Sequence, residues 1–255
     1  MANPNTGRFT WHELMTTDPA KAVKFYEALL GWKTQEVPMG QMGTYRLFLN
    51  ADKQVAGAMP AQAGVPSHWL VYVGSENPDA SCAKAKELGG KVIVPPTDVP
   101  GMVRFAVAMD PQNAAFGILK GLGPNANDPP YEGPPRLGTF CWDELYTKDQ
   151  AAAGKFYGAL FGWTGKVAPD DPMKYWHWQN AGKDIGGMMN LPAPNVPPHW
   201  VGYIAVSDAD ASCKKAKDLG AKIIMEPMDI PKVGKFGFIQ DPTGAAVALF
   251  RSAMV

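Results

Sequence analysis

The chain of 255 residues carries 24 basic and 24 acidic side chains, so its formal net charge is zero. Apolar residues make up 46% of the sequence and charged residues 19%, enough apolar material for one large core or two ordinary ones. This composition argues against intrinsic disorder, and it offers no overall charge that would attract nucleic acid or an anionic membrane.

The first predicted element is a strand over residues 9–15, and a helix beginning at Asp18-Pro19 follows it. Asp accepts hydrogen bonds from the free amides of a first helical turn, and Pro suits the first helical position. Apolar residues continue at helical spacing until Gly31 ends the helix. Two short strands are then predicted, over residues 45–49 and 54–59.

The same order of elements then starts again. Residues 68–73 (HWLVYV) alternate like a strand, and residues 79–88 form a helix that Gly89-Gly90 closes. An Asp-Pro turn is expected at residues 110–113. The remaining strands are predicted over residues 91–94, 103–109 and 115–119. The first 120 residues therefore hold two successive β-α-β-β-β units.

The second half of the chain repeats the first at an offset of 131 residues. Residues 11–32 read WHELMTTDPAKAVKFYEALLGW, and residues 142–163 read WDELYTKDQAAAGKFYGALFGW. The same offset relates His68-Trp69 to His199-Trp200. We expect an α+β protein with four β-α-β-β-β modules. Its predicted parts are a first domain over residues 1–120, a Pro- and Gly-rich linker over 121–138, and a second domain over 139–255.

This pattern closely resembles the vicinal oxygen chelate superfamily of glyoxalases, extradiol dioxygenases and bleomycin-resistance proteins. The resembling motifs are DPAKAVKFYEALLGW, HWLVYV and MDPQNAAFGIL, and all three recur in the second half. The tandem W-x-E-L-x-T-x-D pattern is most similar to a hydroxylase or glyoxalase-like subgroup that includes a two-domain mycobacterial antigen. The resemblance implies two U-shaped, eight-stranded mixed sheets, each formed by two modules and each able to hold a ligand in its cup.

The resemblance also implies a divalent metal, held by a His of the first strand, a His of the fifth strand and a Glu of the last strand. Trp11 and Trp142 stand at the first place, whereas Gly117 and Ala248 stand at the last. The fourth strands, where glyoxalases carry another Glu, read VAG and IGG. Only the fifth-strand residues match, and they are His68 and His199. We therefore predict no metal and no other cofactor.

Strand alternation predicts the residues that face each cup. One Glu, one His, one Tyr and one Trp are expected there among apolar residues, a composition typical of a small-molecule pocket. The predicted ligand-binding residues are Trp11, Glu13, His68 and Tyr72 in the first cup, and Trp142, Glu144, His199 and Tyr203 in the second. Trp176 and Trp178, which replace Arg46 and Phe48 of the first half, are added as an aromatic cluster that either binds ligand or belongs to the core.

Two further alternatives stay open at this point. Trp11 and Trp142 either fill the former metal sites or form aromatic walls for an organic ligand. Glu13 with His68, and Glu144 with His199, are either buried polar pairs or candidate acid-base pairs that move a proton without a metal.

The leading hypothesis is a cytoplasmic protein that binds a small organic molecule in its cups without the family metal. Two alternatives are a metal-dependent glyoxalase-like lyase or dioxygenase (hydroxylase-type) with non-standard ligands, and a catalytically silent scaffold with filled cups. The N-terminal residues MANPNTGRFT show no apolar leader, and no apolar run is long enough to span a bilayer. We expect neither nucleic acid nor membrane as a partner, and either a monomer with internal pseudo-symmetry or a homodimer.

Overall fold

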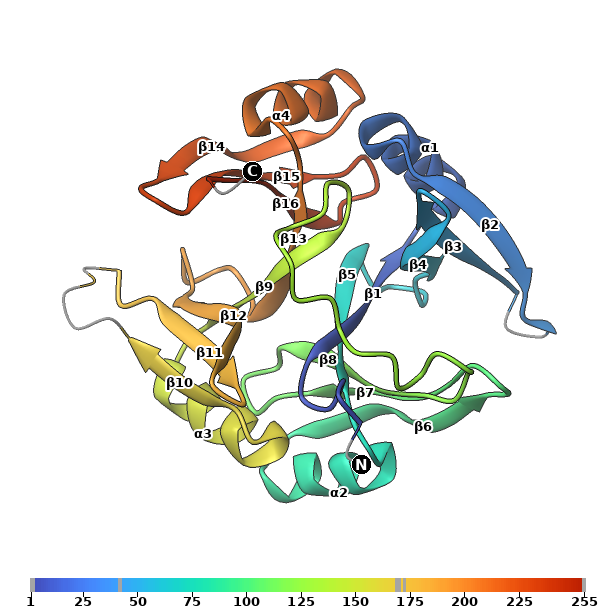
Figure 1. Ribbon diagram of the computed structural model, residues 1–255, viewed down its shortest axis with the longest axis vertical. Coiled ribbons are helices and arrows are strands. Elements are labelled where there is room, and N and C mark those ends of the chain that lie inside the picture. Colours follow the sequence, from blue (N-terminus) through green and yellow to red (C-terminus); the bar gives the residue numbers. More distant parts are fainter. Residues whose placement is uncertain (1–2, 41–42, 168–170, 172, 254–255) are drawn as a thin grey trace. The chain divides into compact units, whose positions relative to one another are not determined.

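A computed structural model describes residues 3–40, 43–167, 171 and 173–253 (Figure 1). The first repeat contains β1 (Phe9–Thr16), α1 (Pro19–Leu30), β2 (Lys33–Pro38), β3 (Thr44–Asn50), β4 (Lys53–Pro60), β5 (His68–Gly74), α2 (Pro78–Glu87), β6 (Lys91–Val99), β7 (Val103–Met109) and β8 (Ala115–Gly121). The second contains β9 (Phe140–Thr147), α3 (Gln150–Phe161), β10 (Thr164–Val167), β11 (Trp176–Asn180), β12 (Lys183–Asn190), β13 (His199–Ala205), α4 (Ala209–Asp218), β14 (Lys222–Ile230), β15 (Gly234–Gln240) and β16 (Ala246–Ser252).

The strands form two eight-stranded mixed sheets with the same topology. The first has the order β2-β3-β4-β1-β5-β8-β7-β6, and the second has the order β10-β11-β12-β9-β13-β16-β15-β14. The pairs β1 with β4 and β9 with β12 are parallel, as are β5 with β8 and β13 with β16. The predicted α+β class and the four β-α-β-β-β modules are confirmed.

The helix ends follow the local chemistry read from the sequence. The Asp18 side chain accepts a hydrogen bond from the Lys21 amide at 3.0 Å, and Gly31 ends α1 in the left-handed region at φ 72°. Asp149 and Gly162 do the same for α3. None of the helices in the described ranges combines the length and the apolar content needed to cross a membrane.

The sequence prediction missed β2 and β10, which lie at the edges of the two sheets. Four of the six side chains of β2 are exposed, so its sequence, KTQEVP, lacks the apolar alternation that marks a half-buried strand. β2 is a strand because it forms hydrogen bonds to β3, and the pattern of apolar residues in a sequence does not reveal such bonds. The prediction also ended β6 too early, because this strand continues through two register shifts around Pro95 and Pro96.

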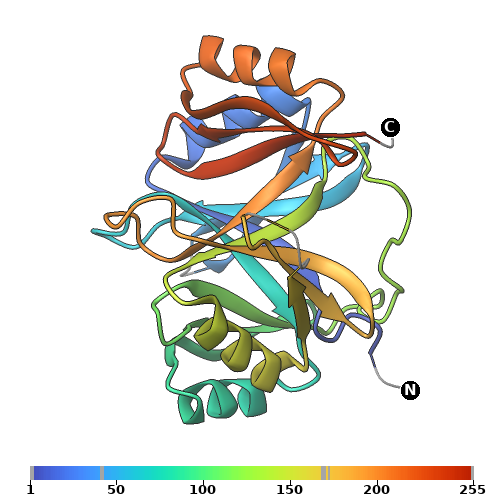
Figure 2. The same cartoon turned by 90° about the vertical axis from the view of Figure 1, so that its left-hand side faces the viewer.

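The chain divides into two compact units, and each unit takes one module from each repeat. The first contains Met1–Trp11, Val71–Glu132 and Trp142–Trp200, and the second contains His12–Leu70, Gly133–Cys141 and Val201–Val255. Figures 1 and 2 show α2 beside α3 in the first unit, and α1 beside α4 in the second. Each unit has its own apolar core, shared by residues of both repeats.

Reciprocal hydrogen bonds join the repeats inside these two cores. In the second unit, Trp69 Nε1 donates to the Tyr26 hydroxyl at 2.9 Å, and Tyr26 donates to Asp241 Oδ2 at 2.9 Å. In the first unit, the equivalent Trp200 Nε1 donates to Tyr157 at 3.1 Å, and Tyr157 donates to Asp110 Oδ2 at 3.2 Å. Burial first, and then the neighbouring carboxylate, raises the pKa of both tyrosines well above the usual range, so both stay protonated donors.

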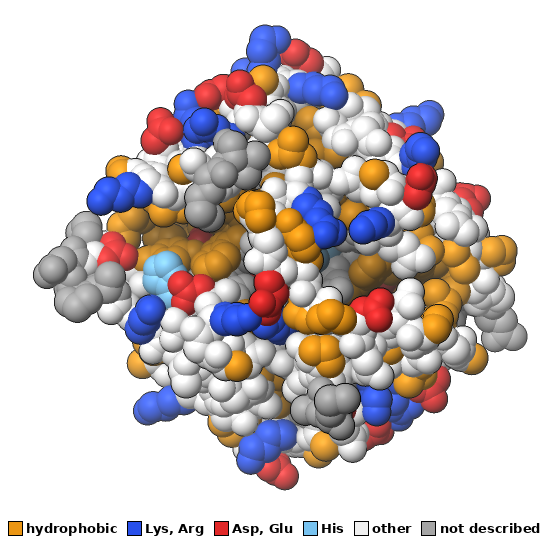
Figure 3. All heavy atoms as spheres, in the orientation of Figure 1, with side chains coloured by type: hydrophobic (Ala, Val, Ile, Leu, Met, Phe, Trp, Pro, Cys, Tyr) orange, Lys and Arg blue, Asp and Glu red, His pale blue; other side chains and the backbone are white. Residues whose placement is uncertain are grey.

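The surface is consistent with the balanced composition. On the face shown in Figure 3, Lys and Arg side chains are interspersed with Asp and Glu side chains. Ion pairs at the surface of the protein include Arg104 with Asp79 and Lys235 with Asp210. Such pairs contribute little to stability, because water and salt screen them.

Removing one hydroxyl from a core tests the reciprocal bonds. We expect Tyr157→Phe to lower the free energy of unfolding by about 1–3 kcal/mol, because Trp200 Nε1 and Asp110 Oδ2 both lose this buried partner. Urea denaturation measures the change. The exposed Tyr131 supplies the control: Tyr131→Phe should stay within about 0.5 kcal/mol. Equal values for the two variants would contradict a structural role for the buried bond.

Candidate functional site

The site with the richest chemistry lies in the second repeat, within the first compact unit. Strand alternation places Trp142, Glu144 and Tyr146 on one face of β9. Tyr175 directly precedes β11, which adds His177, and His199 is the first residue of β13. We call these six residues the Trp142 site.

A chain of two hydrogen bonds connects three of these residues. Trp142 Nε1 donates to the Tyr175 hydroxyl at 2.8 Å, and Tyr175 donates to Glu144 Oε2 at 2.7 Å. Glu144 is only 3% exposed, whereas Trp142 and Tyr175 are half-buried. Burial, followed by the charge of Glu144, raises the pKa of Tyr175, so the phenol stays protonated and keeps donating. The indole ring is thereby held in one orientation.

A glycine makes this arrangement possible. Gly187 of β12 pairs with Glu144 of β9, and a Cβ atom at Gly187 would lie 1.8 Å from the Tyr175 hydroxyl oxygen. In the first repeat, Gly57 pairs with Glu13, and its Cβ would lie 1.9 Å from the Tyr45 hydroxyl oxygen. Sequence reasoning treated these glycines only as missing carboxylates and did not select either tyrosine. The recurrence of both residues in the two repeats was the available signal.

His199 is held by its backbone neighbour and by a stacked ring. Its Nδ1 lies 2.7 Å from the Pro197 carbonyl oxygen, and its ring stacks on Tyr146 with centroids 5.4 Å apart and planes 14° apart. Burial lowers the pKa of His199, and the hydrogen bond to Pro197 opposes this only in part. Glu144 accepts a hydrogen bond from Tyr175, and the hydrogen bond of His199 goes to Pro197. Within the described residues, no hydrogen bond joins His199 to Glu144 as the predicted acid-base pair.

His177 belongs to the same face and was not among the predicted site residues. It stands where the first repeat has Leu47 and packs edge-on against Trp142 and Tyr175, at centroid distances of 6.3 and 5.0 Å. Its Nδ1 lies 3.7 Å from Asp184 Oδ2.

Trp176 and Trp178 do not join this face. Trp178 is completely buried and packs against Tyr157 and Trp163. Trp176 packs against Gly154 of α3, where a Cβ atom would lie 3.2 Å from the indole ring. The reason is alternation along β11, which points His177 to one side and both indoles into the core.

The predicted residues of the first repeat fall into both compact units. In the second unit, Glu13 is 8% exposed, and His68 Nδ1 lies 2.9 Å from the Pro66 carbonyl oxygen. In the first unit, Trp11 is half-buried, and Tyr72 lies across Gly117, where a Cβ would be 2.1 Å from its ring. Here too, the hydrogen bond of the histidine goes to the backbone.

Tyr72 and Tyr203 serve packing in this structure. They are 3% and 5% exposed, respectively. Tyr203 contacts three rings in the second unit, which belong to Phe236, Phe238 and Phe250.

The residues present do not fit the metal that the resemblance implies. Among the described residues, no three His, Cys, Asp or Glu side chains come together as a possible metal site. The ring of Tyr72 occupies the space beside Gly117, at the place of the expected last-strand carboxylate. A single imidazole and a carboxylate bonded to a phenol do not supply the three protein ligands of such a centre.

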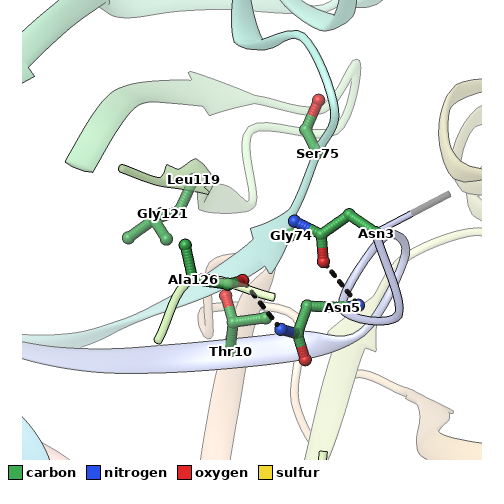
Figure 4. Close-up of a pocket in the computed structure, with 8 residues that line it drawn as sticks. All are labelled: Asn3, Asn5, Thr10, Gly74, Ser75, Leu119, Gly121 and Ala126. Atoms are coloured by element: carbon green, nitrogen blue, oxygen red, sulfur yellow. Dashed lines mark hydrogen bonds between the residues drawn. The ribbon is translucent and has the colours of Figure 1, made fainter. Parts of the chain in front are cut away.

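The structure also contains a cavity that is lined by none of the predicted site residues. It has a volume of about 150 Å³ and lies in the first compact unit (Figure 4). Two hydrogen bonds join polar groups of its lining: Asn3 Oδ1 accepts from the Asn5 amide at 2.9 Å, and Asn5 Nδ2 donates to the Ala126 carbonyl at 3.2 Å. This cavity offers no titratable side chain, so it is a poor candidate for the functional site.

Comparison with known proteins supports the two-repeat architecture. The profile described as "Glyoxalase/Bleomycin resistance protein/Dioxygenase superfamily" matches residues 8–118 and 137–249. Proteins of Mycobacterium bovis and Mycobacterium tuberculosis named "Putative glyoxylase CFP32" are each 34% identical over 256 residues, covering 97% of this chain and 95% of theirs. The anthracycline biosynthesis proteins DauV of Streptomyces sp. (strain C5) and DnrV of Streptomyces peucetius are 33% identical, covering 95% of this chain and 92% of theirs.

Solved structures of low sequence identity share the fold. The 2,3-dioxygenase LapB of Pseudomonas sp. KL28 has a TM-score of 0.63 at 13% identity, with 98% of this chain and 94% of that chain covered. The Mn(II)-bound glyoxalase of Novosphingobium aromaticivorans has a TM-score of 0.62 at 14% identity, with coverages of 97% and 82%. At these identities the likeness concerns the fold alone.

A single methyl group at Gly187 tests the hydrogen-bonded chain. We expect Gly187→Ala to displace the Tyr175 hydroxyl, break its bonds to Trp142 and Glu144, and lower the free energy of unfolding by about 1–3 kcal/mol. Urea denaturation measures the loss, and the Trp emission spectrum reports the freed indole. Gly123→Ala is the control, since its nearest neighbour would be 3.5 Å away. If both variants are equally stable, Tyr175 is not held in the way described.

Proposed function

Because the chain belongs to the Glyoxalase/Bleomycin resistance protein/Dioxygenase superfamily, we propose that it binds a planar aromatic molecule at the Trp142 site and needs no metal to do so. The family's fold brings strands of two modules together around a ligand, whereas the side chains of this chain set the kind of ligand.

The observation that carries the proposal is the anchored indole of Trp142. Its polar edge is bonded to Tyr175, so its orientation is set without a ligand, and its side chain stays half-buried. A preorganised ring loses little conformational entropy on binding, and aromatic rings favour stacked or edge-on contact with another planar ring. This arrangement favours the interpretation that Trp142 forms an aromatic wall for an organic ligand over the alternative that it only fills the former metal site.

The surroundings of Trp142 are also aromatic. His177 packs edge-on against it, and the Tyr146–His199 stack lies on the same unit. Mostly apolar walls with a few oriented polar groups are typical of small-molecule sites. The first repeat has Met15 and Leu47 where the second has Tyr146 and His177, so we assign the aromatic ligand to the second repeat.

The relatives support an aromatic ligand. DauV and DnrV carry the name anthracycline biosynthesis protein, and anthracyclines are built on fused planar rings. The independence from metal rests on the donor set described above, in which Glu144 is bonded to a phenol and His199 to a carbonyl.

Replacement of the indole tests this proposal. With 2-naphthol as the probe, we expect Trp142→Ala to weaken binding at least tenfold in titration calorimetry, because the stacking wall is lost. The saturated analogue 2-decalol should bind the wild type more weakly than 2-naphthol, because it is not planar. Trp11→Ala is the matched variant of the first repeat and should leave the affinity for 2-naphthol within about twofold.

Two results would contradict the proposal. One is an affinity for 2-naphthol that Trp142→Ala leaves unchanged while the variant remains folded by circular dichroism. The other is stoichiometric zinc, nickel or iron in protein purified without chelators, together with binding that disappears when the metal is removed. The second result would favour a metal-dependent lyase or dioxygenase.

A further inference from the structure

The hydrogen bond from His199 to the backbone determines which of its ring nitrogens carries a proton. A carbonyl oxygen only accepts hydrogen bonds, so Nδ1, at 2.7 Å from the Pro197 oxygen, must be the donor. A neutral imidazole has a single N–H group, which leaves Nε2 with a lone pair. Burial favours this neutral form by lowering the pKa of His199. At neutral pH, Nε2 is therefore a hydrogen-bond acceptor.

The same ring is held in place before any ligand arrives. Tyr146 stacks on one face of the imidazole, and Pro197 and Pro198 restrict the chain that leads into β13. No described residue forms a hydrogen bond to Nε2, and the imidazole is half-buried. In the first repeat, His68 forms the same backbone bond, but Met15 stands in the place of Tyr146. Only the second repeat has the complete support.

Two of the neighbouring donors are already used within the site. The indole N–H of Trp142 is given to Tyr175, and the hydroxyl hydrogen of Tyr175 is given to Glu144. The carboxylate itself only accepts when it is ionised. A ligand with a hydroxyl group would supply the donor that Nε2 lacks.

We propose that His199 determines the specificity of the Trp142 site, with Nε2 accepting a hydrogen bond from a hydroxyl group on the planar aromatic ligand. The inference rests on the function proposed above and narrows its ligand class to hydroxylated aromatic compounds. A methyl ether of the same ring system, or a carboxylate in place of the hydroxyl, has no hydrogen to donate and leaves Nε2 unpaired.

Three ligands of one ring system test the inference by titration calorimetry at neutral pH: 2-naphthol, 2-methoxynaphthalene and 2-naphthoate. We expect the wild type to bind 2-naphthol about tenfold more tightly than either the ether or the carboxylate. His199→Phe, which retains a flat ring against Tyr146, should bind naphthol and ether equally. The matched His68→Phe variant of the first repeat should keep the tenfold preference.

A measurement on the wild type does not depend on any variant folding. Long-range ¹H–¹⁵N spectra should show His199 as the Nδ1–H form, and the Nε2 resonance should move towards lower frequency when 2-naphthol binds but not when the ether binds. A mere packing role for His199 would leave that resonance in place with both ligands.

The outcomes separate the two proposals. If 2-naphthol and its ether bind the wild type equally well, the function stands and the inference about His199 is overturned. If His68→Phe, and not His199→Phe, removes the preference, the inference is also overturned. If neither compound binds the wild type, the proposed function fails and this inference fails with it.

Discussion

The fold depends on two buried tyrosines that reach across the sequence repeat. Each of them accepts a hydrogen bond from a tryptophan of its own repeat, which is Trp69 of β5 for Tyr26 and Trp200 of β13 for Tyr157. Each also donates a hydrogen bond to the aspartate of the Asp-Pro turn in the other repeat. The other oxygen of each aspartate is bonded to backbone amides of its own turn, so the acceptor is fixed before the tyrosine meets it. Because an unpaired group in these cores would be costly, the bonds specify which modules pack together. The compact units therefore mix the repeats even though each sheet belongs to one repeat.

The Trp142 site obeys the same constraint, namely that buried polar groups need hydrogen-bond partners. The family's metal would bind several side-chain ligands at once. Here, instead, the indole donates a hydrogen bond to the phenol, and the phenol donates one to the carboxylate. Gly187 is the condition for this solution, because any side chain there would occupy the space of the Tyr175 hydroxyl. What remains for a ligand is an oriented aromatic surface and the acceptor nitrogen of His199, which together favour a flat molecule with a hydroxyl group.

Sequence reasoning located one part of this site and missed another for identifiable reasons. Alternation along β9 placed Trp142 and Glu144 on one face, and the family pattern pointed to His199. Tyr175 escaped because it precedes its strand, where no periodicity applies. Trp176 and Trp178 were included because they differ from Arg46 and Phe48 of the first repeat, although alternation along the same strand separates them from His177 and places them in the core.

By itself, the sequence determined the repeat, the four modules and the helix ends, since these depend on spacing and on local hydrogen bonds such as those of Asp18 and Gly31. It also showed that the places of the expected metal ligands carry Trp, Gly and Ala. Only the tertiary structure decided that modules of different repeats share a core, that polar β2 is a strand, and that Tyr175 connects Trp142 to Glu144. These outcomes depend on partners that are distant in the chain. The free energy of a hydrogen bond depends on which groups meet after folding, and a local sequence pattern does not predict which groups these are.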